Sequence, residues 1–431
     1  MRLILFLLWS VTVVSALPPV VWLVPIGCDY SGFFVEVLAY LTGLVSIFSE
    51  GNLFLSMGKC SEAFLSSLAP GEAAVLERLQ SDYEKKKPKW KNTIVIHHKL
   101  PGTPFSSFCS RNSLERPLLV IGRMMTEASY LSPSEVEQAA NMDEIWVPSD
   151  YHISVFTDAG IPDSKLFVLP EAANVDFYAN KEIFDSNIKD ECVQAKTDAE
   201  NCQTLPVTKQ KQKIFQFVSV FKYEGRKGAD ILLTSYWRAF TNDDAVELVI
   251  RSYKPSWERG TSNLMNAFNQ LALGTFGVPM SQLAKVTWIE ENLSKKELRT
   301  LYQTSDVFVL PTRGEGWCLP CVEAMSAGLP IIVTNFSGPT MYLRSEHSYP
   351  LPILKNKDSG AALLNDDGTA KPDSDQLSAL MRYVYLNQDE AKEKGLKAQE
   401  FAAQEFNPLH LATRIHDRLH YLYNQKRKLK I

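Results

Sequence analysis

The chain has 431 residues, of which 45% are hydrophobic and 22% are charged, and its net charge at pH 7 is −4. This length favours two domains of ordinary size over one large core, and the composition is that of a folded globular protein rather than a disordered one. Because there is no surplus of positive charge to neutralise a phosphate backbone, we do not expect the chain to bind nucleic acid.

The first residues have the pattern of a secretory signal peptide. Arg2 supplies a positive charge, residues 3–14 are almost entirely apolar, and Val14-Ser15-Ala16 offers the small residues that signal peptidase accepts. The apolar stretch is short for a bilayer span. We therefore predict a signal peptide over residues 1–16 and a location in the lumen of the endoplasmic reticulum or secretory pathway. The alternatives are an uncleaved anchor, or a cytoplasmic protein if the leader is not functional.

Short apolar runs, bounded by turn or capping residues, alternate with segments of helix length. Parallel strands that are covered on both faces give this pattern. The strands predicted in the first half of the chain are residues 20–25, 45–48, 53–56, 93–97, 118–121, 144–147 and 166–169. Those in the second half are residues 214–220, 246–251, 286–289, 307–310 and 331–334. The pattern predicts two doubly wound α/β domains that face each other across a crevice at the carboxyl ends of their strands.

A polar segment without periodicity separates the two series of strands. We predict a first domain over residues 20–180, a linker or insertion over 181–212 and a second domain over 213–405. Residues 406–431 form a last predicted helix that can cross back to the first domain. Its basic end, residues 426–430, is interpreted as solvated, with contact to a membrane surface as the alternative.

Several side chains of the first domain follow predicted strands, at the sheet edge where ligands bind in such folds. Gly27 would let a ligand approach the backbone closely, with an ordinary turn as an equal alternative. His97 and His98 end one strand, and for strand-end histidines a structural role is the more common one. Arg123 and Glu127 follow another strand, and for them ligand contact and packing between the domains are both open.

Residues 306–343 are the most informative segment of the chain. A strand leads through a glycine-rich turn to Glu315, and a helix then carries Glu323. Pro320 suits the first turn of that helix because it has no N–H to leave unpaired. The backbone before it is therefore expected to present free N–H groups to an anionic or hydroxyl-rich ligand. These amides belong to Gly316, Trp317, Cys318 and Leu319.

A lysine pair follows the first strand of the second domain. Lys222 and Lys227 lie on the turn before a predicted helix. Two cations at this place can neutralise a leaving diphosphate. A lysine-rich loop is more often only solvated, and Glu315 by itself could merely cap its helix. Together on one sheet, the two motifs predict a cleft that binds a diphosphate compound.

The seven cysteines leave at least one unpaired. Cys192 and Cys202 lie in the polar linker, where a small disulfide loop could form in an oxidising lumen. Cys318 and Cys321 have the Cys-x-x-Cys spacing, but neither a second pair nor a histidine cluster accompanies them. We therefore do not expect a zinc site.

Taken in order, these motifs resemble family 4 of the retaining glycosyltransferases, whose GT-B fold has two Rossmann-like domains facing across a cleft. Glu315-x7-Glu323, within GEGWCLPCVEAMSAGLPIIVTNFSGPT, resembles the family signature, and Lys222-x4-Lys227 resembles its diphosphate site. The stretches 121–127, 141–149 and 168–176 are also similar, so that the resemblance spans roughly residues 20–405.

The resemblance implies a metal-independent hexosyltransferase that moves a hexose-type sugar, with retention, from a nucleotide diphosphate sugar to a glycan, lipid or protein acceptor. Glu315 would lie against the transferred sugar, Glu323 would bind the ribose, and Lys222 and Lys227 would bind the diphosphate. The amides of residues 316–319 would contact sugar hydroxyls or phosphate. The first domain would hold the acceptor. The donor is a substrate, and no cofactor is implied.

Three positions depart from the family pattern. Cys318 replaces a glycine, Met341 replaces a glutamate, and Lys222 replaces an arginine and so loses its bidentate geometry. These departures motivate an alternative from another class, a catalytically inactive protein of the secretory pathway that binds nucleotide sugars or glycans. An NAD-dependent enzyme is set aside, because neither glycine-containing loop has the Gly-x-Gly-x-x-Gly spacing.

Overall fold

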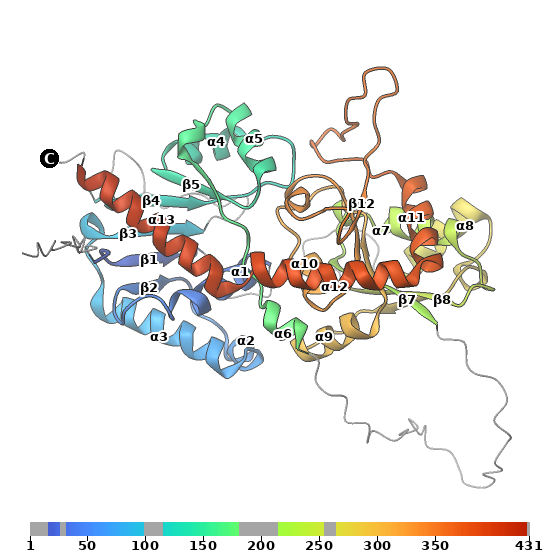
Figure 1. Ribbon diagram of the computed structural model, residues 1–431, viewed down its shortest axis with the longest axis horizontal. Coiled ribbons are helices and arrows are strands. Elements are labelled where there is room, and N and C mark those ends of the chain that lie inside the picture. Colours follow the sequence, from blue (N-terminus) through green and yellow to red (C-terminus); the bar gives the residue numbers. More distant parts are fainter. Residues whose placement is uncertain (1–15, 26–31, 99–114, 181–213, 254–263, 429–431) are drawn as a thin grey trace, which may run out of the picture.

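The computed structural model describes residues 16–25, 32–98, 115–180, 214–253 and 264–428 (Figure 1). The predicted leader, Gly27 and the pair Cys192 and Cys202 lie outside the described residues, as does the predicted linker.

The first domain is built on a six-stranded parallel sheet in the order β2-β1-β3-β4-β5-β6. Its strands are β1 (Val20–Leu23), β2 (Leu53–Ser56), β3 (Ile94–His98), β4 (Leu119–Arg123), β5 (Glu144–Val147) and β6 (Leu166–Val168). Its helices are α1 (Gly32–Leu44), α2 (Glu62–Ser67), α3 (Pro70–Lys86), α4 (Pro133–Ala140) and α5 (Asp150–Asp158). Separate apolar clusters pack on the two faces of this sheet.

The second domain repeats this architecture, with a six-stranded parallel sheet in the order β12-β11-β10-β7-β8-β9. Its strands are β7 (Phe215–Lys222), β8 (Val246–Tyr253), β9 (Val286–Ile289), β10 (Val307–Leu310), β11 (Ile331–Thr334) and β12 (Tyr349–Leu351). The helices after the first domain are α6 (Val175–Ala179), α7 (Ala229–Ala239), α8 (Leu264–Phe276), α9 (Lys295–Thr304), α10 (Leu319–Ser326), α11 (Ser374–Leu386), α12 (Gln388–Glu405) and α13 (Pro408–Lys428). The predicted fold class, two doubly wound parallel sheets, is confirmed.

The last helix, α13, lies on the first domain (Figure 1). It packs against α1 so closely that a side chain on Gly43 would lie 2.3 Å from the carbonyl oxygen of Pro408. Leu411 and Ile415 are buried in the first core. Lys426, in the basic end, lies 3.4 Å from the carboxylate of Asp143. None of the described helices has both the length and the apolar character needed to span a bilayer.

The strand predicted at residues 45–48 is wrong. The amides of Val45 and Phe48 donate to the carbonyls of Leu41 and Leu44, so that this segment is a turn that ends α1. Its apolar side chains pack against the first core only in part. A short apolar run fits a strand and a helix end equally well, which is why the sequence misled here. The edge strand β12 was not predicted, and it contains Pro350, which lacks a ladder N–H.

Candidate active site

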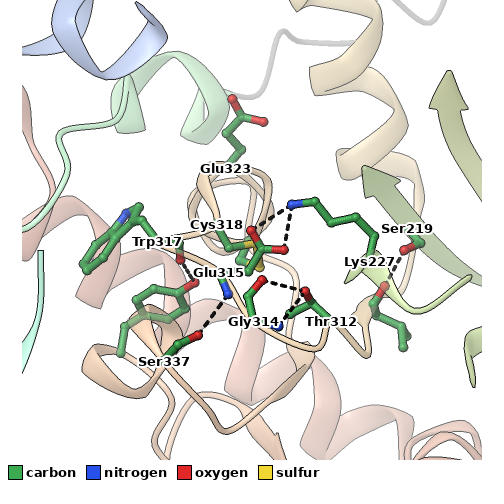
Figure 2. Close-up of a disulfide and its surroundings, with 12 residues drawn as sticks. Ser219, Lys227, Thr312, Gly314, Glu315, Trp317, Cys318, Glu323 and Ser337 are labelled. Carbon is green, nitrogen blue, oxygen red and sulfur yellow. Dashed lines mark hydrogen bonds and ion pairs between the residues drawn. A yellow bond between two sulfur atoms is a disulfide. The ribbon is translucent and has the colours of Figure 1, made fainter. Parts of the chain in front are cut away.

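Glu315 lies in the turn between β10 and α10, and a second turn fixes its backbone from both sides (Figure 2). Its N–H donates to the Oγ of Ser337 at 2.9 Å, and its carbonyl accepts from the N–H of Gly338 at 3.0 Å. A side chain on Gly338 would lie 1.9 Å from the carbonyl oxygen of Gly316, so this approach requires glycine. The position of the Glu315 side chain is therefore set by the fold.

The structure brings Glu315 and Lys227 together, as the sequence predicted. The Nζ of Lys227 lies 2.7 and 2.8 Å from the two carboxylate oxygens of Glu315. Burial by itself raises the pKa of Glu315, but the charges of Lys227 and Arg226 outweigh it and hold the pKa below its ordinary value. Glu315 is therefore a buried, ionised carboxylate whose side chain is 6% exposed.

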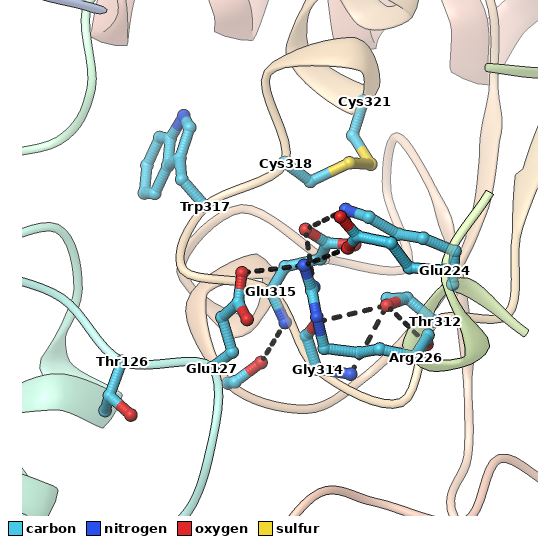
Figure 3. Close-up of polar contacts among 12 residues, drawn as sticks. Thr126, Glu127, Glu224, Arg226, Thr312, Gly314, Glu315, Trp317, Cys318 and Cys321 are labelled. Carbon is cyan, nitrogen blue, oxygen red and sulfur yellow. Dashed lines mark hydrogen bonds and ion pairs between the residues drawn. A yellow bond between two sulfur atoms is a disulfide. The ribbon is translucent and has the colours of Figure 1, made fainter. Parts of the chain in front are cut away.

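Arg226 is a member of this cluster that the sequence analysis missed. Its guanidinium donates to the carbonyl of Gly314 and lies 3.3 Å from Glu315. It also lies 2.7 Å from the carboxylate of Glu127, which belongs to the first domain (Figure 3). The signal was present in the sequence, since Arg226 stands between the two lysines already singled out. Its partner Glu127 could not be known before the domains were placed.

The segment 316–319 leads into α10 with its backbone available and its side chains buried. Within the described part of the chain, no partner accepts a hydrogen bond from the amides of these four residues. Trp317 packs on Tyr342 and Phe406, with ring centroids 5.1 and 5.2 Å apart, so its side chain belongs to the core. Leu319 is likewise buried. The backbone of this segment, rather than its side chains, is therefore available to a ligand.

Gly316 lies where the first domain packs against the turn that carries Glu315. A side chain here would lie 2.5 Å from the Sδ of Met125. A side chain on Gly314 would similarly lie 2.2 Å from the carbonyl oxygen of Glu127. Both glycines therefore allow the first domain to pack directly against the turn that carries Glu315.

Cys318 and Cys321 form a disulfide bond across the first turn of α10 (Figures 2 and 3). Cys318 has φ 80° and ψ 74°, a left-handed conformation that glycine adopts without strain. The cysteine that replaces the family's glycine thus keeps a backbone conformation suited to glycine and is tied to the helix. The Cys-x-x-Cys spacing by itself does not predict this disulfide bond, and no cluster of metal-ligating side chains occurs among the described residues.

Glu323 and Lys222 are not part of the ion pairs around Glu315. Glu323 accepts a hydrogen bond from Tyr302 at 3.1 Å, and Figure 2 shows it pointing away from the Glu315 carboxylate. Burial raises its pKa, although hydrogen bonds from Tyr178 and Tyr302 oppose this effect. Lys222, the last residue of β7, is half-buried. Of the four predicted groups, Glu315 and Lys227 are in direct contact. The roles of Glu323 and Lys222 stay predictions.

The side chains of His97, His98 and Arg123 are enclosed in the first domain. Glu36 on α1 lies 2.7 Å from Arg123 and 3.1 Å from His98. Burial raises the pKa of Glu36, but the charges of Arg123 and His98 outweigh it and lower the pKa. Arg123 and His98 are thus paired inside the first domain, whereas Glu127 makes the contact between the domains that the sequence left open. An acceptor role for these side chains, and for His97, stays a prediction.

Residues 281–363, which include Glu315 and Glu323, match the family model of the group 1 glycosyl transferases. A 65-residue segment is 38% identical to the Escherichia coli UDP-Gal:alpha-D-GlcNAc-diphosphoundecaprenol alpha-1,3-galactosyltransferase. That match spans 15% of this chain and only 17% of the enzyme's length.

Two solved structures illustrate the similarity of the fold. A glycosyltransferase from Rickettsia africae has a TM-score of 0.63 and 11% identity over 94% of this chain and 98% of its own. Anabaena HepE, in complex with UDP and glucose, has a TM-score of 0.59 and 12% identity over 93% of this chain and 99% of its own. At such low identity these similarities show the fold alone.

Proposed function

We propose that this protein, whose residues 281–363 match the group 1 glycosyl transferases and which has the GT-B fold, transfers a hexose-type sugar from a nucleotide diphosphate sugar to an acceptor. The contact between Glu315 and Lys227 is the observation that supports this most strongly. It places an ionised carboxylate and an ammonium group beside the available amides of residues 316–319. Such a site offers donors to a diphosphate and an acceptor to sugar hydroxyls.

In the proposed reaction, the departing diphosphate is the group whose charge must be stabilised. Lys227 and the amides before α10 would bind its oxygens, and the positive end of the helix would add to their effect. Glu315 would accept hydrogen bonds from hydroxyls of the transferred sugar. Because fixed positive groups supply this stabilisation, we propose that the transfer needs no metal ion. Glu323 would hold the ribose from the other side of α10.

We propose that transfer proceeds with retention, as the family resemblance implies. The acceptor hydroxyl would attack from the face that the diphosphate leaves, and a phosphate oxygen would take its proton. The acceptor, a glycan, lipid or protein, would bind to the first domain. The alternative of a protein that binds donors without transfer is less well supported, because Cys318 keeps a glycine-like backbone and Glu315 remains ionised.

We further propose that the protein acts in the lumen of the secretory pathway. The leader pattern over residues 1–16 motivates this location. Two observations agree with an oxidising compartment: Cys318 and Cys321 form a disulfide bond, and Cys60 is also disulfide-bonded.

A thermal-shift screen of UDP-, GDP- and ADP-sugars tests the proposal. The UDP-sugars come first, because HepE binds UDP and glucose. A donor present at a hundred times its Kd should stabilise the native state by about 2.7 kcal/mol. The stabilising donor is then incubated with candidate acceptors, and the anomeric configuration of the product is read by NMR. Absence of stabilisation by every donor would contradict the proposal.

A further inference from the structure

Carboxylates from both domains hold Arg226. Glu127 of the first domain lies 2.7 Å from its guanidinium, while Glu224 and Glu315 of the second domain each lie 3.3 Å from it. The contact with Glu127 is therefore the shortest of these ion pairs, and it crosses between the domains (Figure 3). The sequence pattern for the diphosphate site does not include Arg226.

The ion pair between Arg226 and Glu127 is within reach of a ligand. The side chain of Arg226 is 20% exposed and that of Glu127 is 40% exposed, whereas Glu315 is 6% exposed. Burial raises the pKa of Glu127 and neighbouring carboxylates add to this effect, while Arg226 opposes it. Arg226 is the cation paired with this carboxylate, and Lys227 adds a weaker attraction. A stronger anion could therefore displace it.

Both cations of the cluster are paired with carboxylates, and a ligand with a higher charge could replace these carboxylates. Arg226 and Lys227 are adjacent in the turn that follows β7, and they face three carboxylates. A diphosphate carries more charge than one carboxylate and offers paired oxygens that match the fork of a guanidinium. A partly exposed ion pair is worth only about 0–1 kcal/mol, so that little is lost when Glu127 is displaced.

We propose that Arg226 is a further donor-binding residue, which binds the diphosphate together with Lys227, and that Glu127 competes with the donor for it. This inference rests on the proposed function and deepens it. Without a donor, Arg226 is bound to the first domain. When the donor arrives, Arg226 exchanges Glu127 for phosphate oxygens, so that Glu127 sets the donor affinity by competing for the guanidinium.

Calorimetric titration with inorganic pyrophosphate tests this inference without requiring the identity of the nucleotide. Arg226→Gln should weaken the binding of pyrophosphate roughly tenfold to a hundredfold, which is the loss of affinity expected when one or two hydrogen bonds between charged groups are removed. Glu127→Gln should tighten binding several-fold at low salt. In the Arg226→Gln background, Glu127→Gln should have no further effect, because the competition acts through Arg226.

Asp230→Asn is the matched control. Asp230 lies on α7 and pairs with Arg313 at 2.7 Å, so this variant removes one carboxylate near the site without touching Arg226. At the same low salt its affinity for pyrophosphate should change much less than that of Glu127→Gln, because Asp230 is paired with Arg313 and not with Arg226. Thermal unfolding checks that each variant is folded. Arg226→Lys, which keeps the charge but loses the fork, should bind with intermediate affinity.

Three outcomes would overturn the inference. They are wild-type affinity in Arg226→Gln, equal tightening by Glu127→Gln with and without Arg226, and equal tightening by Asp230→Asn and Glu127→Gln. A wild-type protein that binds a nucleotide sugar while Arg226→Gln changes nothing would leave the proposed function intact. A wild-type protein that binds pyrophosphate through Arg226 but no nucleotide sugar would instead contradict the proposed function alone.

Discussion

Each domain contains a glutamate between two basic side chains, and the two clusters differ in their access to water. In the first domain, Glu36 lies between Arg123 and His98, and all three side chains are at most 1% exposed. In the second, Glu315 lies between Arg226 and Lys227, whose side chains are 20% and 15% exposed. The first cluster holds α1 against the sheet. The second is within reach of a ligand, and we propose that this difference in burial, rather than residue type, gives the two clusters different roles.

The largest expected effect is on stability, in the first cluster. Glu36→Gln removes the carboxylate that pairs directly with buried Arg123, which should lower the free energy of unfolding by about 3–5 kcal/mol. Urea denaturation followed by circular dichroism measures this loss. Glu72→Gln is the control, because it removes a more exposed ion pair with Lys295 and should cost at most about 1 kcal/mol. Equal losses of unfolding free energy in the two variants would show that burial does not make the Glu36 ion pairs more important for stability than an exposed ion pair.

The next effect is on catalysis, in the second cluster. Glu315→Gln should reduce the rate of transfer by a factor of roughly 10² to 10³, because the amide lacks the negative charge with which the carboxylate would stabilise the transition state. The fold should be retained, since this side chain lies beside groups that water can reach. Initial rates with a saturating donor measure the effect, and unfolding curves check stability. A variant that transfers sugar at the wild-type rate would show that Glu315 is structural, like Glu36.

A third effect concerns pH and a buried histidine of α5. His152 is buried, bonds to Ser149 and to the carbonyl of Thr126, and burial lowers its pKa to about 3. Below pH 6.5 the unfolded chain binds a proton that the native chain excludes until about pH 3. The contribution of His152 is therefore present above pH 6.5 and is lost as pH falls, by about 1.4 kcal/mol per pH unit.

The difference in unfolding free energy between the wild type and His152→Asn, measured from pH 7.5 to pH 4.5, isolates this contribution. The unfolding free energy of the wild type should exceed that of His152→Asn by less and less as the pH falls. A difference that stays constant with pH would show that His152 is accessible to protons in the native state.

The smallest effect concerns the disulfide bond before α10. A left-handed conformation costs a residue other than glycine about 1–2 kcal/mol. The double variant Cys318→Ala with Cys321→Ala should therefore bind donor roughly fivefold to thirtyfold more weakly. Cys318→Gly with Cys321→Ala should bind it like the wild type, because glycine adopts this conformation freely. Calorimetry with the best donor compares them, and equal affinities in both would show that the bridge does not position the amides.

The sequence predicted the two sheets because strands covered on both faces appear as continuous apolar runs. It also predicted that Glu315 and Lys227 meet, since they follow β10 and β7, which are neighbours in the sheet. It did not predict the contact of Arg226 with Glu127, because that ion pair depends on how the two domains dock. Nor did it predict the bond between Cys318 and Cys321, since their spacing is equally compatible with free thiols or a metal site.

Calorimetric binding of nucleotide diphosphate sugars to the wild type and to Lys227→Ala tests whether Lys227 holds the diphosphate. At least one donor should bind the wild type and bind Lys227→Ala at least about tenfold more weakly, the loss expected for one charge-assisted hydrogen bond. Equal affinity of both proteins for every donor that binds would contradict this prediction, because the ammonium group beside Glu315 would then have no part in holding the diphosphate.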